Sequence, residues 1–341
     1  MFNKKFFGIL FIAVFTFLLL SCATTVNVKM LRPAKLDLQG AKSIAVLPFK
    51  PSSSYSTMVD SENAVVSAIG TFFQIFDNKN PYEEKLLNLL KSTIEEGLAS
   101  SKYIDLVSSE SVQNALKNSR TPPVDVYLLG SSTDFHINDE HKVEKTKISD
   151  EYYTEDGRFV KAKYDYKDEY KRTVYLSCNY QLVDAVTNKV ISYRNFSLET
   201  SSSTCYSKSD LPDPYSMLKK QVYHKGQDIL CLLQPYVVTK SIELMEDKTK
   251  NEAFKNANNL AKKGEIEESY QAFYDLYFST GMMEAGYNAA MLDMARGNLS
   301  MAEKMMKELY SIYQDERILT GLKDIQNEIK LAERLRTQTG I

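Results

Sequence analysis

The stretch Ser43–Phe49 (Ser-Ile-Ala-Val-Leu-Pro-Phe) decides the fold class of this chain. It is a near-continuous apolar run that comes just after Gly40. A run of this length is typical of a strand buried on both faces, as in an α/β sheet. Pro48 has no backbone N–H, so it indicates the end of the strand or a sheet edge. The sequence therefore predicts that a sheet begins here.

Four further segments alternate between helix and strand signals. Residues 82–100 are predicted to form an amphipathic helix, because leucine or isoleucine recurs every fourth residue. Residues 103–107 predict a strand, residues 109–118 a shorter helix, and residues 124–130 another strand. The order strand, helix, strand, helix, strand predicts helices packed on a sheet.

A long antiparallel hairpin is predicted next. Residues 172–184 alternate strictly between apolar and polar side chains, and residues 190–198 form the returning strand. The segment before them, residues 142–172, is dense in charges of both signs and in tyrosine. It is expected either to extend the sheet as a solvated ribbon or loop, or to form a partner-docking surface. Residues 215–246 are predicted to be largely helical, with a kink or break at Pro235.

The composition becomes helical from Asn251 onward. Two units look alike, and their glycines, Gly264 and Gly297, lie 33 positions apart. Each glycine is predicted to end a helix in a left-handed cap. The apolar residue two positions later, Ile266 or Leu299, is expected to close the helical hairpin.

This pattern resembles tetratricopeptide repeats over about residues 250–312. A closing helix is predicted over residues 318–334. In that family the concave groove binds peptides, and Tyr287 and Asn288 are candidates for partner binding. With so few repeats, a dimerising or packing role is the alternative.

The amino-terminal end has the layout of an export signal, with a basic start and an apolar run from Phe6 to Leu20. At roughly 15 residues, this run is short for a membrane span. The run closes in Leu-Leu-Ser-Cys at residues 19–22, which resembles the lipobox of bacterial lipoproteins. That resemblance implies cleavage between Ser21 and Cys22 and lipidation of Cys22. The alternatives are an ordinary cleaved signal or an uncleaved anchor, with Cys22 incidental.

The predicted fold class is an α/β (α+β) sheet domain with packed helices, followed by an all-α, tetratricopeptide-like domain. We place the signal peptide at residues 1–21 and a lipidated tether at residues 22–40. The α/β domain is predicted at residues 41–248, and the helical domain at residues 249–341.

Charge and cysteine content limit the classes of function that the chain is expected to have. The net charge of −2 argues against a broad basic face for nucleic acid. Cys178 lies on the alternating strand and is expected to be a small core residue. A disulfide between Cys205 and Cys231 is an open alternative.

The segment from Ala64 to Phe76 carries no charge and is strongly apolar. It is interpreted either as a core-packed helix or as a surface that meets membrane or another subunit. Under the second interpretation, Phe72, Phe73 and Phe76 are candidates for partner binding.

The order of these elements over roughly residues 41–246 resembles exported lipoproteins of the curli-secretion type, the penicillin-binding-protein activators and the amino-terminal domain of the TolB group. The resemblance implies a non-enzymatic domain at an outer membrane that acts through oligomerisation or partner contact. Ala23 is not the aspartate that favours inner-membrane retention in enteric lipoproteins. An outer membrane, facing the periplasm, is therefore the expected address, and the cell surface is the alternative.

No nucleotide-binding loop, zinc-protease motif or nucleophile elbow occurs in the sequence, so no catalytic residue, metal ligand or cofactor is assigned. One ligand-rich cluster remains, either as a zinc site or as a solvated strand end: Asp134, His136, Asp139, Glu140 and His141. The leading hypothesis is a membrane-anchored envelope lipoprotein that binds protein partners and has the capacity to self-associate. The alternatives are an oligomeric secretion or channel component of the curli-transport type and a metal-dependent hydrolase.

Overall fold

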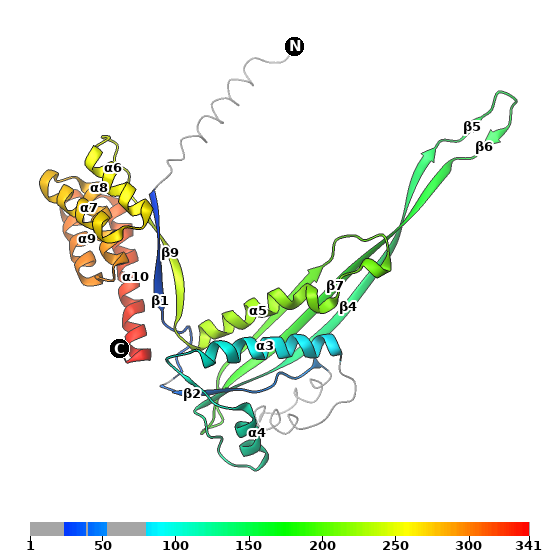
Figure 1. Cartoon of the computed structure of the whole chain (residues 1–341), viewed down its shortest axis with the longest axis horizontal. Helices are drawn as coiled ribbons and strands as arrows, with labels where there is room; N and C mark the ends of the chain where they lie inside the picture. The colour runs from blue at the N-terminus through cyan, green and yellow to red at the C-terminus, as the bar shows by residue number, and fades with distance from the viewer. Residues whose placement is uncertain (1–23, 39, 53–79, 341) are drawn as a thin grey trace. The chain divides into compact units, whose positions relative to one another are not determined.

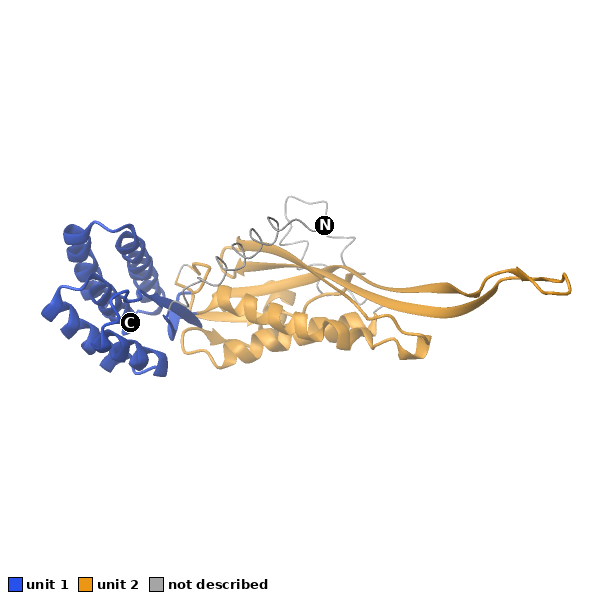
Figure 2. Cartoon of the chain, turned by 90° about the horizontal axis from the view of Figure 1, so that it is seen from above, with its two compact units in different colours: residues 1–33, 235–341 blue, residues 34–234 orange. Residues whose placement is uncertain are grey.

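The computed structural model describes residues 24–38, 40–52 and 80–340. The chain divides into two compact units (Figure 2), residues 34–234 and residues 1–33 together with 235–341. We call them the sheet unit and the helical unit. Several residues singled out above lie outside the described residues: Ser21, Cys22, Phe72, Phe73 and Phe76.

The sheet unit is built on a five-stranded sheet of order β3-β2-β4-β7-β8 (Figure 1). Strand β2 (Ser43–Val46) is the predicted apolar strand and pairs in parallel with β3 (Asp105–Leu106) and β4 (Val126–Ser149). Strand β7 (Lys163–Asp184) runs antiparallel to both β4 and β8 (Val190–Ser201). The predicted mixed α/β architecture is confirmed for this unit.

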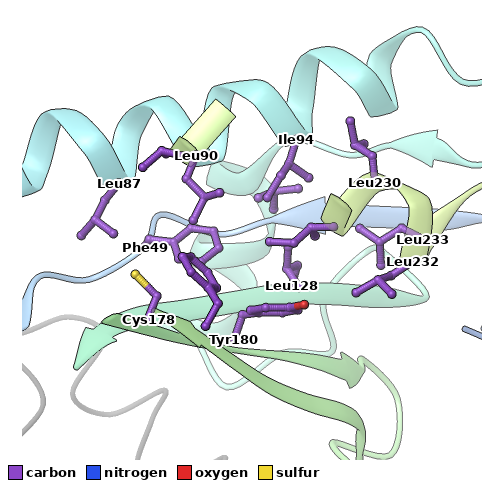
Figure 3. Packing of buried hydrophobic residues seen from close by; sticks show 14 of the residues in the cluster. Phe49, Leu87, Leu90, Ile94, Leu128, Cys178, Tyr180, Leu230, Leu232 and Leu233 are labelled. Atoms are coloured by element: carbon purple, nitrogen blue, oxygen red, sulfur yellow. The ribbon is translucent and has the colours of Figure 1, made fainter. Parts of the chain in front are cut away.

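Helices cover both faces of this sheet. Helices α3 (Pro81–Ala99) and α5 (Pro214–Leu233) bury their leucines against the strand residues that share one face, among them Val46, Leu128 and Cys178 (Figure 3). Helix α4 (Ser109–Lys117) packs against the alternate residues of the same strands. Because side chains alternate across a strand, β2 is buried on both faces, as its apolar run predicts.

The predicted helix over residues 215–246 is wrong in its second half. Helix α5 ends at Leu233, and Tyr236–Leu244 forms strand β9. This strand pairs antiparallel, over nine residues, with β1 (Thr24–Arg32). The physical reason is the alternation in β9, which buries Ile242 and Leu244 against the helical unit.

Helices α6 (Glu252–Lys263), α7 (Ile266–Thr280), α8 (Met283–Ala295), α9 (Leu299–Tyr313) and α10 (Glu316–Thr339) form the rest of the helical unit. Gly264 and Gly297 have φ of 81° and 89°, so both occupy the predicted left-handed positions after a helix. A common core joins these helices to the β1–β9 pair. In the described ranges, no helix has the length and apolar character needed to cross a membrane.

Candidate functional site

The candidate site is a two-stranded ribbon. Strands β4 and β7 continue to pair beyond Asp139 and Arg172, out to Ser149 and Lys163. The short strands β5 (Tyr152–Tyr153) and β6 (Phe159–Val160) pair within the connection between them. We call residues 139–172 the ribbon; it projects from the body of the sheet unit (Figure 1).

The register gives the ribbon two chemically different faces. Residues directly opposite each other in an antiparallel pair share a face. One face alternates charge across the strands, with Glu140 opposite Lys171, Lys142 opposite Glu169, and Glu144 opposite Lys167. The other face continues the line of core residues Ile137 and Val174 outward. We call it the aromatic face, and it carries His141, Val143, Lys145, Lys147, Tyr164, Tyr166, Asp168 and Tyr170.

Side chains on the aromatic face contact one another while remaining open to solvent. The Nζ atom of Lys145 lies 3.8 Å from the ring centre of Tyr164 and 5.8 Å from that of Tyr166. Tyr166 is 62% exposed and Val143 is 53% exposed. Cation–π contacts at exposed sites contribute only about 0.5–1 kcal/mol. These contacts therefore stabilise the ribbon only slightly. The exposed apolar area of the face remains available to a partner.

An ion pair marks the boundary between core and ribbon. The Nε and Nη2 atoms of Arg172 donate to the Asp139 carboxylate at 2.6 and 2.7 Å, and Nη1 donates to the carbonyl of Pro212 at 2.9 Å. The hydrogen bonds from Arg172 lower the pKa of Asp139. The Arg172–Asp139 ion pair therefore lies at the end of the apolar core, where the ribbon begins.

The far end of the ribbon is also aromatic. The rings of Tyr153 and Phe159 lie 5.2 Å apart on paired strands. Tyr152, Tyr153 and Phe159 are 54%, 73% and 49% exposed. Large exposed apolar side chains gathered on one element are typical of an interaction surface.

The ligand-rich cluster predicted from the sequence is divided between the two faces of the β4–β7 pair. His136 lies 3.3 Å from Asp134 on one face, as the alternation predicts. Asp139 and His141 lie on the other face, where Asp139 binds Arg172 and the Nε2 atom of His141 lies 2.7 Å from Asp168. In the part of the chain that the structure describes, no three His, Cys, Asp or Glu side chains form a metal-binding group.

The other predicted site residues in the described ranges lie inside the helical unit. Asn288 is fully buried; its Oδ1 accepts from the Met245 N–H at 2.7 Å and its Nδ2 donates to the Met245 carbonyl at 2.9 Å. Tyr287 is 8% exposed, and burial raises its pKa to about 12. Their role in partner binding stays a prediction, and their observed contacts are structural.

The tyrosines of the aromatic face were not named as site residues by sequence reasoning. The signal was present, since Tyr164, Tyr166 and Tyr170 are separated by even intervals and therefore share a face in a strand. Cys178 is buried as predicted, and Cys205 and Cys231 are free thiols.

No family model and no curated protein matches this chain. Solved structures give distant similarities. A PelC dodecamer from Paraburkholderia phytofirmans is 14% identical, covering 62% of this chain and 98% of that one, with a TM-score of 0.26. A hemagglutinin homolog from Helicobacter pylori is 12% identical, covering 58% and 87%, with a TM-score of 0.28. A hypothetical protein from Chlamydia trachomatis is 11% identical, covering 47% and 71%, with a TM-score of 0.21. Scores of this size do not establish a shared fold.

Proposed function

We propose that the chain is a lipid-anchored protein of the bacterial cell envelope that acts as a non-enzymatic scaffold, and that the aromatic face of the ribbon docks a partner protein. The observation that carries the proposal is the difference between the two faces. The charged face neutralises itself by opposite charges across the strands, whereas the aromatic face exposes tyrosine and valine beside Lys145, Lys147 and Asp168. Interfaces are enriched in tyrosine, and a polar rim commonly surrounds their apolar centre.

The lipid anchor is proposed from the sequence. The basic start, the apolar run and Leu-Leu-Ser-Cys at residues 19–22 support acylation of Cys22. Two or more acyl chains hold a protein stably on a membrane, whereas one holds it marginally. The outer membrane, facing the periplasm, is the proposed address.

The helical unit is proposed to be tetratricopeptide-like. Two supports are the left-handed glycines and the succession of helices of 12 to 15 residues from α6 to α9. Its role in this proposal is to pack against β1 and β9 and to offer a second surface for protein contact.

A second candidate function is an oligomeric secretion or channel component of the curli-transport type. One observation favours it. Within the described residues, β4 and β7 pair only with each other from His141 to Lys147 and from Tyr164 to Glu169. Unpaired strand edges are templates for strands of another chain, including a second copy.

Site-specific photo-crosslinking in the native membrane tests the docking surface. A photoreactive amino acid at Tyr166 is expected to capture a protein, while the same group at Glu144, on the charged face, captures little. Equal yields at both positions, or none at either, would contradict a role for the aromatic face. If the captured protein is the chain itself, and light scattering shows a discrete oligomer, the second candidate replaces the first.

A separate variant tests the anchor. Cys22→Ala is expected to abolish fatty-acid labelling and to release the chain from the membrane fraction. Retained labelling would rule out acylation at Cys22, whatever the crosslinking result.

A further inference from the structure

The proposed lipid anchor is separated from a folded strand by one residue. Strand β1 begins at Thr24, which is 4% exposed and pairs with Leu244 at the end of β9. Only Ala23 lies between Thr24 and Cys22. Two Cα–Cα steps span at most about 7 Å. An acylated Cys22 would therefore hold this end of the β1–β9 pair at the membrane surface, with no long tether between them.

A polar cleft opens at this same end of the helical unit. It has a volume of about 430 Å³ and includes Thr24 in its wall. Three lysines from the start and the exposed side of α6 also line it: Lys250, Lys255 and Lys262. Lys255 lies 3.6 Å from Glu252, whereas neither Lys250 nor Lys262 forms an ion pair with a described residue.

Acceptor groups lie beside these cations, because the carboxylates of Glu246, Asp247 and Glu252 also line the cleft. Asn258 lines the cleft, and its buried Oδ1 atom accepts no hydrogen bond from any described residue. A buried acceptor without a donor is destabilising, so a donor supplied by a ligand would be favoured there. Cations next to an unused acceptor suit a zwitterionic ligand that carries both a phosphate and an ammonium group.

We propose that this cleft holds a phospholipid headgroup of the membrane in which the acyl chains of Cys22 are inserted, with Lys250 and Lys262 binding the phosphate and Asn258 accepting from a primary ammonium. This inference rests on the proposed acylation of Cys22. The short link from Cys22 to Thr24 is the reason for choosing a membrane lipid as the occupant. Lipids next to the acyl chains of Cys22 would lie within reach of the cleft wall. The helical unit then sits on the membrane, and the links to the sheet unit leave from the opposite end of the strand pair, at Arg32 and Tyr236.

The absence of tryptophan from the chain gives a direct test of membrane contact. Asn259→Trp places a fluorophore in the cleft wall. Val237→Trp is the matched control, because Val237 is 62% exposed and lies seven residues along β9 from Leu244, about 24 Å away. Mass spectrometry first verifies the lipid on each full-length variant. The acylated variants are then reconstituted in phosphatidylethanolamine–phosphatidylglycerol vesicles. These vesicles contain headgroup-spin-labelled lipid, which quenches nearby tryptophan.

Tryptophan at position 259 is expected to lose most of its fluorescence, and tryptophan at position 237 to keep most of it. Equal quenching at the two positions in chains that do carry lipid would overturn the inference and leave the proposed anchor intact. Absence of lipid on Cys22 would instead refute the proposed anchor.

A charge comparison tests the cleft itself. In a Cys22→Ser chain, Lys250→Ser with Lys262→Ser is expected to reduce cosedimentation with the same vesicles several-fold. The control, Lys323→Ser with Lys330→Ser on exposed positions of α10, makes the same change in net charge. An equal loss in both double variants would show nonspecific attraction and overturn the headgroup site. Vesicles in which phosphatidylcholine, whose ammonium cannot donate, replaces phosphatidylethanolamine at the same phosphatidylglycerol content are expected to bind the parent chain more weakly, and equal binding would remove Asn258 from the proposal.

Discussion

Arg32 and Glu328 form a two-pronged ion pair although 296 positions separate them in the sequence. Arg32 ends strand β1, and Glu328 lies in helix α10 with only 5% of its side chain exposed. Lys240 of β9 donates to the same carboxylate at 2.6 Å. One buried carboxylate thus holds both strands of the β1–β9 pair to the last helix.

Removing this carboxylate should destabilise the helical unit. Glu328→Ala leaves two cations facing a buried site, and breaking a buried pair from one side costs about 3–5 kcal/mol. Urea unfolding followed by far-ultraviolet circular dichroism measures the loss. Glu303→Ala, which removes a carboxylate paired with the exposed Lys307, is the control and should cost less than about 1 kcal/mol. Equal costs for the two variants would contradict the special role of Glu328.

The same carboxylate predicts a dependence on pH. Burial raises the pKa of Glu328, but the hydrogen bonds from Arg32 and Lys240 outweigh it and hold the pKa below its ordinary value of 4.5. A lowered folded-state pKa means that the stabilisation is complete above the unfolded-state pKa and is lost as the pH falls through the folded-state pKa. The unfolding free energies of wild type and Glu328→Gln should therefore differ at pH 7 and converge in acid below about pH 4. A constant difference across this range would show that the charge of Glu328 is irrelevant.

Asn288 gives a prediction inside the helical core. Asn288→Ala leaves the N–H and carbonyl of Met245 without their side-chain partner in a buried site, at a cost of about 1–3 kcal/mol for each unsatisfied group. Asn256→Ala, at an exposed position of α6, is the control and should change stability by less than about 0.5 kcal/mol. Thermal unfolding of the two variants checks this difference, and matching midpoints would contradict it.

Local patterns predicted the elements that carry a strong periodic or capping signal of their own. Each of three patterns indicates the element that contains it: the apolar run at Ser43–Phe49, the leucine spacing of α3 and the glycine caps after α6 and α8. Strand β9 was missed because its partner, β1, is about two hundred residues away, and the helical signal of α5 was extended through Pro235 into it. Long-range pairing overrides a weak local preference.

The candidate site was predictable in composition but not in geometry. Dense charge and tyrosine in residues 142–172 predicted either a solvated ribbon or loop that extends the sheet or a partner-docking surface, and the structure shows a paired ribbon. Tyr164, Tyr166 and Tyr170 share a face by alternation along β7, but the β4 residues that lie beside them depend on the β4–β7 register and on the irregularity between Ser132 and Asp134. A one-residue change in register would place the alternate β4 side chains beside the tyrosines, so the composition of the aromatic face required the structure.

Helix packing in the sheet unit provides a prediction about Gly226. A Cβ atom at this position of α5 would lie 2.7 Å from Cγ2 and 2.9 Å from Cβ of Thr93 in α3. Gly226→Ala should therefore destabilise the chain by about 1–3 kcal/mol through overpacking, although alanine favours an isolated helix by about 1 kcal/mol. Gly226→Ala combined with Thr93→Ser, which removes the crowded methyl group, should recover part of the loss. Urea unfolding measures both, and a Gly226→Ala chain more stable than wild type would refute the close contact.

The ribbon should be the part of the sheet that opens most easily. Inside the sheet unit, β4 residues such as Leu128 lie between two paired strands and under helices, whereas ribbon residues have one partner strand and exposed side chains. Opening free energies follow local burial, so amides from His141 to Lys147 should exchange with solvent much faster than those from Val126 to Gly130. Hydrogen exchange with mass spectrometry measures both segments in one sample.

If a partner docks on the aromatic face, its addition should slow exchange from His141 to Lys147. Tyr164→Ser with Tyr166→Ser should abolish that protection while changing the unfolding free energy by less than about 1 kcal/mol, because both rings are exposed. A large loss of stability in this double variant would mean that the tyrosines hold the fold rather than the partner.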